Sequence, residues 1–115
     1  MVITRTEAKA AFDHVLDTVL DRYGSKDLKE ALVKEGFVDI FLVLIIVDAD
    51  IESLVYQDPA DATKTVPIHR DNVVMLKCFK AYVNHRNISG TPIDDTDWIN
   101  LTQAEFDLFR IDPTN

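Results

Sequence analysis

The histidines and the lone cysteine are the side chains best suited to catalysis or metal binding, and they are dispersed along the chain. His14, His69 and His85 have no Cys or carboxylate at the spacing of a zinc site, which needs several convergent ligands. Cys78 has no adjacent base and lies beside an apolar stripe, which is typical of a small core residue rather than of a nucleophile. There is also no glycine-rich phosphate loop and no known serine–histidine–aspartate motif. We therefore expect a protein that is not an enzyme and has no cofactor or metal.

Two acidic clusters are the remaining candidates for a metal site. The run 48–52, Asp-Ala-Asp-Ile-Glu, could hold Mg²⁺ or Ca²⁺, but it lacks the glycine and the later glutamate of a calcium loop. Asp48 and Asp50 are explained more simply as residues that break and cap a helix. The acids at 94, 95 and 97 resemble a solvated turn. A small metal protein is thus the weaker alternative.

Length and composition predict one helical domain. The chain has 115 residues, of which 47% are hydrophobic, with only 3 Gly and 4 Pro, a composition that suits helices better than a β fold with many turns. The longest apolar run, 40–47, is far too short to span a membrane, and no signal peptide is visible at the start. The lone cysteine favours a reducing compartment, so we expect an intracellular protein of the cytoplasm or nucleus.

Apolar periodicity and capping signals place about five or six helices in a compact all-α bundle. Thr4 with Glu7, and Thr102 with Glu105, have capping-box spacing, and Gly36 is placed to end a helix. We expect an N-terminal helix within 1–24 and a C-terminal helix within 97–111. Between them we expect helices at 26–35, 37–47, 51–56 and 68–86, with surface loops at 57–67 and 87–98.

The stretch 37–47 is ambiguous, because it is apolar all round and rich in β-branched residues. Periodicity alone fits a buried strand or a buried helix. No other segment alternates convincingly enough to pair with a strand. We therefore predict a short central helix that is buried on all sides and around which the amphipathic helices pack.

Charge is segregated along the chain, whose net charge is −8. Residues 1–63 have a net charge of −7 and residues 91–115 of −5, whereas residues 64–90 have a net charge of +4. Cations at the start of a helix oppose its dipole, so His69 and Arg70 are either part of a solvated face or a place where something acidic docks. The basic segment could meet the acidic cluster around Asp48 on a neighbouring copy, in a head-to-tail contact.

Residues 26–86 resemble a sterile alpha motif (SAM-like) domain, a family with four short helices followed by a long fifth one. The resemblance is carried by 28–38, by the acid-capped segment 48–54, and by Pro67-Ile68-His69-Arg70 leading into the apolar run 73–76. Pro67-Ile68 stands where the family usually has Gly, and the preceding loop is long. The resemblance implies a basic contact face and an acidic one, which we place at Lys64, His69, Arg70, Lys77 and Lys80, and at Asp39, Asp48, Asp50 and Glu52.

The whole chain is also similar to the N-terminal region of retrotransposon-type polyproteins of diatom-like microalgae. The segments that carry this similarity are 12–16, 48–56, 97–98 and 105–110. It implies an assembly-related or scaffolding part of a longer protein. We therefore expect a protein-interaction or self-assembly module, whose partner is another protein or a second copy bound head-to-tail. The alternative is nucleic-acid binding through the basic segment 64–86, which the acidic net charge disfavours.

Overall fold

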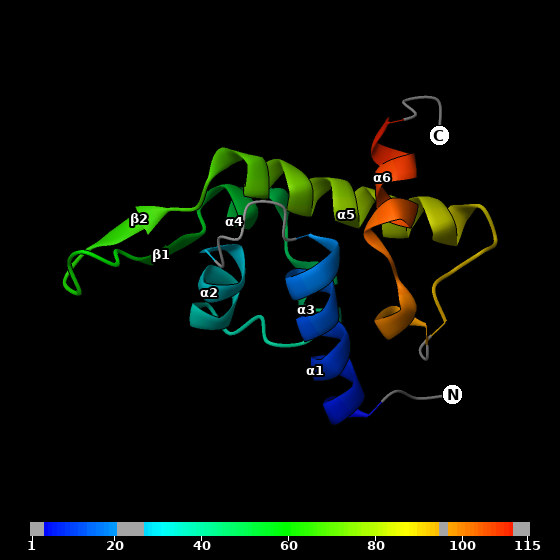
Figure 1. Ribbon diagram of the computed structural model, residues 1–115, viewed down its shortest axis with the longest axis horizontal. Coiled ribbons are helices and arrows are strands. Elements are labelled where there is room, and N and C mark those ends of the chain that lie inside the picture. The colour runs from blue at the N-terminus through cyan, green and yellow to red at the C-terminus, as the bar shows by residue number, and fades with distance from the viewer. Residues whose placement is uncertain (1–3, 21–26, 95–96, 112–115) are drawn as a thin grey trace.

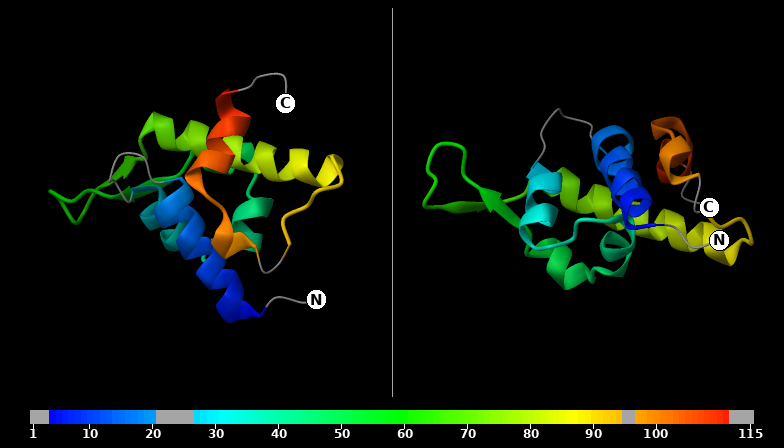
Figure 2. Two further views of the ribbon diagram at one scale, coloured as in Figure 1. Left: turned by 45° about the vertical axis from the view of Figure 1, so that its right-hand side comes forward. Right: turned by 90° about the horizontal axis from the view of Figure 1, so that it is seen from below.

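The computed structural model describes residues 4–20, 27–94 and 97–111, and it is mostly helical, which confirms the all-α class. The long helix α5 (Arg70–Ile88) runs across the molecule, and the last helix, α6 (Gln103–Ile111), crosses it and packs against it (Figures 1 and 2). Phe79 lies at the centre of the core, fully buried, with its ring 5.8 Å from that of Phe106 in an edge-to-face arrangement. This aromatic contact joins the middle of α5 to the C-terminal helix α6 (Gln103–Ile111).

The predicted N-terminal helix begins as expected and then changes its winding. Thr4 and Glu7 form both hydrogen bonds of the capping box at the start of α1 (Arg5–His14). The helix continues as one π turn, η1 (Val15–Val19), and residues 21–24 of the prediction lie outside the described part. The predicted apolar stripe is buried from Phe12 to Leu20.

Three short helices follow, and the ambiguous stretch is helical. They are α2 (Asp27–Lys34), α3 (Ile40–Ile45) and α4 (Asp48–Glu52), and Gly36 ends the first with a φ of 88°. The prediction that this stretch is buried on all sides was wrong. Ile40 and Val43 are fully buried, whereas Ile45 is 70% exposed. This helix of six residues packs one face on α1, and the side chains of Phe41 and Ile45 on its other face are exposed.

A small β-hairpin replaces the predicted helix 51–56 and the predicted loop 57–67. Strands β1 (Val55–Gln57) and β2 (Thr65–Pro67) pair antiparallel, with Tyr56 opposite Val66. The carboxylates of Asp58 and Asp61 accept hydrogen bonds from the backbone two residues on, which favours turns over a helix. The positions of Asp48 and Asp50 also differ from the prediction, because both residues lie inside α4 rather than capping a later helix.

The C-terminal segment packs on the body. After the short helix η2 (Trp98–Asn100), the Thr102 hydroxyl accepts a hydrogen bond from the backbone N–H of Glu105 at 3.1 Å, as the capping signal predicts. His14 Nε2 lies 2.7 Å from the carbonyl oxygen of Leu101, an acceptor to which the protonated nitrogen donates. This bond ties α1 to the start of the last helix.

Candidate interaction surface

The predicted basic and acidic faces meet within one chain, across the contact between α4 and α5. Glu52 is the centre of this charge cluster. One of its oxygens accepts from Arg70 Nη1 at 2.5 Å, and the other accepts from the Lys77 ammonium. These hydrogen bonds, from Lys77 first and then from Arg70, hold the pKa of Glu52 below its ordinary 4.5.

Lys80 extends the same contact by one turn of α5. Its ammonium donates to the backbone carbonyl of Ile46, at the end of α3, and lies 3.9 Å from the carboxylate of Asp48. Only 24% of the Lys80 side chain is exposed, compared with 74% of the Asp48 side chain. The cation is therefore held against the body, while the carboxylate stays largely in water.

The other predicted contact residues lie apart from this cluster. Lys64 lies at the far end of the hairpin, 3.8 Å from Asp61, and His69 caps α5 by accepting the N–H of Asp71 on its ring nitrogen. Asp39 caps α3 through the N–H of Leu42, and Asp50 is exposed in the first turn of α4. The structure thus brings together Glu52, Arg70, Lys77, Lys80 and Asp48, and leaves Lys64, His69, Asp39 and Asp50 elsewhere.

Sequence reasoning missed the buried carboxylate that joins α2 to α5. Asp27 is only 5% exposed, and its side chain accepts hydrogen bonds from the backbone N–H of His69 at 2.8 Å and from the amide of Asn72. Asn72 is itself 4% exposed. An acid followed at once by an apolar helix face signals only a helix start, and gives no indication of a partner 42 residues away.

The second missed feature is an exposed apolar stripe on α3. Phe41 and Ile45 are four residues apart, so their side chains project from one face of α3, and Val38 lies just before the N-cap residue Asp39. Val38, Phe41 and Ile45 are 41%, 41% and 70% exposed, and Val47, just after the helix, is 56% exposed. We call these four residues the α3 stripe. In the right-hand view of Figure 2, α3 and α4 lie at the edge of the molecule opposite α1 and α6.

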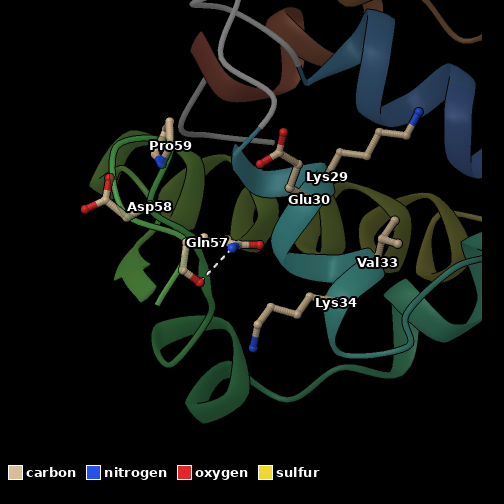
Figure 3. A pocket seen from close by; sticks show the side chains of 8 residues that line it. Lys29, Glu30, Val33, Lys34, Gln57, Asp58 and Pro59 are labelled. Atoms are coloured by element: carbon tan, nitrogen blue, oxygen red, sulfur yellow. Dashed lines mark hydrogen bonds between the residues drawn. The ribbon is translucent and has the colours of Figure 1, made fainter. Parts of the chain in front are cut away.

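A hollow of about 830 Å³ opens between α2 and the hairpin (Figure 3). Lys29 points from its rim towards α1, where its ammonium lies 3.1 Å from the carboxylate of Asp13 and 3.0 Å from that of Asp17. Lys34 lies 3.7 Å from the carboxylate of Glu35. We assign no ligand to this hollow, because both of its lysines are engaged by acids of the chain.

His85 and Cys78 are held by packing. The ring of His85 lies 5.4 Å from that of Phe109, and Cys78 is partly buried against the core. Within the ranges that the structure describes, no three His, Cys or acidic side chains are grouped so that they could hold a metal ion. No helix of this part of the chain is long and apolar enough to cross a bilayer.

No protein-family model, curated protein or solved structure matched this chain. The SAM-like and retrotransposon relationships therefore stay predictions. Within 26–86 the structure has three short helices and the hairpin before α5, where the SAM-like resemblance implies four short helices.

Proposed function

We propose that this chain is a non-catalytic protein-interaction module of a longer protein, and that its partner docks on the α3 stripe. The observation that carries the proposal is that four exposed large apolar side chains are grouped on and beside α3. The other exposed large apolar side chains are distributed over α2, α5, η2 and α6. Apolar side chains that are exposed together commonly mark protein-contact sites. Covering them removes apolar surface from water, which supplies most of the free energy of association.

The charge cluster around Glu52 argues against two other functions, head-to-tail self-assembly and nucleic-acid binding. In a head-to-tail assembly, Arg70 and Lys77 would pair with Glu52 of a neighbour, yet they already pair with it inside one chain. A neighbour would have to break these contacts before it could form its own. The same pairing neutralises part of the basic segment that a nucleic-acid phosphate would need.

Site-specific photocrosslinking in the full chain tests this function. A photoreactive amino acid replaces Phe41 in one protein and Val74 in another, because these residues are 41% and 45% exposed but lie on α3 and α5. We expect position 41 to give a discrete product in which the chain is crosslinked to its partner protein, and position 74 to give none. Equal labelling at both positions would contradict the proposal.

A matched pair of surface substitutions completes the test. Ile45→Asp places a charge in the α3 stripe, while Ile88→Asp does the same at the end of α5, and the two isoleucines are 70% and 79% exposed. We expect Ile45→Asp to remove the crosslinked product from position 41, and Ile88→Asp to leave it unchanged. A product that survives Ile45→Asp would rule out the α3 stripe as the docking face.

A further inference from the structure

The shape of the α3 stripe suits a partner helix. Phe41 and Ile45 lie about one helical turn apart on the exposed side of α3, and the residues on its opposite side, Ile40 and Val43, are fully buried. An amphipathic helix that presents apolar residues at a three- and four-residue spacing would cover this stripe along its length.

Carboxylates lie at both ends of the stripe. Asp39 is the N-cap of α3, and Asp48 and Asp50 lie in the first turn of α4, which begins three residues after the end of α3. Asp48 is 74% exposed, and its nearest described cation is Lys80 at 3.9 Å. Against these three carboxylates stands Lys80, whose ammonium lies at the Ile46 carbonyl just after α3. The carboxylates at the two ends of the stripe therefore outnumber the lysine beside it.

A shallow depression next to the stripe has the same character. Its volume is about 380 Å³, and Glu35 and Asp50 lie on its rim together with the apolar side chains of Phe37 and Leu54. A lysine or arginine of a partner could lay its aliphatic stem on these apolar residues and place its charged end between the carboxylates.

A second copy of the chain is poorly suited to this face, because most of the lysines and arginines in the described part of the chain already lie beside its own acids. Each of seven cationic side chains has a carboxylate of the same chain at 3.9 Å or less: Lys9, Lys29, Lys34, Lys64, Arg70, Lys77 and Lys80. With a net charge of −8, two copies also repel each other. The partner must bring the positive charge itself.

We infer that the α3 stripe binds a cationic amphipathic helix of a partner protein, with its apolar face on Phe41 and Ile45 and its lysines or arginines at Asp48 and Asp50. This inference rests on the proposed function, and it adds the chemical class of the partner. Attraction between the acidic rim and a basic helix raises the association rate and selects against acidic helices.

Three synthetic peptides of 18 residues test the inference by fluorescence anisotropy with the full chain. The first has Leu on one helical face and Lys on the other, the second has Glu in place of Lys, and the third has the composition of the first in scrambled order. We expect the first to bind at least ten-fold more tightly than the other two, and to weaken as the salt concentration rises. Equal binding of the Lys and Glu peptides, or of the ordered and scrambled Lys peptides, would overturn the inference.

Substitutions in the protein locate the binding site. We expect Asp48→Asn with Asp50→Asn to weaken binding of the Lys peptide by about three- to ten-fold, since exposed charge pairs are individually weak. The control removes two carboxylates at the hollow of Figure 3, through Glu30→Gln with Asp58→Asn, and should leave the affinity nearly unchanged. An equal loss in both double variants would show general attraction to an acidic protein and would overturn the inference.

The outcomes separate the inference from the proposed function. If the Lys and Glu peptides bind equally and Ile45→Asp abolishes both, the α3 stripe is a docking face but its cationic partner is refuted. If light scattering reveals a dimer that Ile45→Asp dissociates, a second copy is the occupant, and the inference falls while the interaction function stands. If neither peptide binds and position 41 gives no crosslink, both fail.

Discussion

Replacing the buried carboxylate of Asp27 by a methyl group should destabilise the fold more than any substitution of the exposed charges. Asp27→Ala leaves the backbone N–H of His69 and the amide of Asn72 without their acceptor, and both lie at the junction of α2 and α5. An unsatisfied buried donor costs about 1–3 kcal/mol. We expect a loss of about 2–4 kcal/mol, a large part of the roughly 5–15 kcal/mol that is typical of a whole domain.

Two companion variants test the origin of this loss. Asp27→Asn keeps the shape, but its amide has one acceptor oxygen where the carboxylate accepts from the N–H groups of Leu28, His69 and Asn72. We therefore expect a smaller loss of about 1–2 kcal/mol. Asn72→Ala removes one donor. Its effect should be markedly non-additive with that of Asp27→Ala, because the two residues share a hydrogen bond.

The assay is equilibrium unfolding in urea, followed by circular dichroism and by the fluorescence of Trp98, which is the only tryptophan and is 4% exposed. Coincident curves from both probes justify a two-state treatment. Ordinary surface substitutions change the free energy of unfolding by no more than about 0.5 kcal/mol. If Asp27→Ala stays within this range of the parent, the buried hydrogen bonds are not what holds α2 to α5.

Three further predictions concern the core, a turn and a surface charge. Phe79→Ala should lower the free energy of unfolding by about 3–5 kcal/mol in the same urea assay, because the fully buried ring packs edge-to-face on Phe106. Gly36→Ala should lower the free energy of unfolding by about 1–2 kcal/mol, because its φ of 88° is strained for a residue with a Cβ. No steric clash adds to this loss, since a Cβ there would meet no atom within 4 Å. The pKa of Glu52 is below 4.5 in the folded state, so its ion pairs stabilise the fold above pH 4.5 and are lost as the pH falls through the lowered pKa. Carboxyl NMR titration should show this pKa rising in Lys77→Met.

Each of these predictions has a result that would contradict it. A loss below about 1 kcal/mol for Phe79→Ala would mean that the site collapses or is not packed as described. Gly36→Ala with unchanged stability would show that the turn adopts another conformation. An unshifted Glu52 pKa in the parent, or the same pKa in parent and Lys77→Met, would show that the Lys77 contact is not formed in solution.

Local signals in the sequence predicted the helices well. Thr4 with Glu7 begins α1, Gly36 ends α2, and the apolar periodicity of α5 matches its buried face, because these features depend on residues within a few positions of one another. The π turn after α1 had no signal of this kind, and neither did the hairpin. Val55 and Tyr56 become a strand because 65–67 supplies its partner, which short-range patterns do not reveal.

The candidate site was predicted only in part. The segregated charges singled out Glu52, Arg70 and Lys77, which pair within one chain, and their predicted contact between molecules stays a prediction. The α3 stripe was missed, because a run that is apolar all round gives no indication of which side stays uncovered.

The sequence by itself determined the helical class, the start and end of most helices, and the apolar residues that build the core. These depend on backbone propensity, capping and periodicity, which operate within one or two helical turns. Only the tertiary structure decided that Asp27 is buried, that Glu52 meets Arg70 and Lys77 in the same chain, and that Ile45 faces solvent. Burial and pairing depend on segments that are distant in sequence, here 18 to 42 residues apart, and folding alone brings them together.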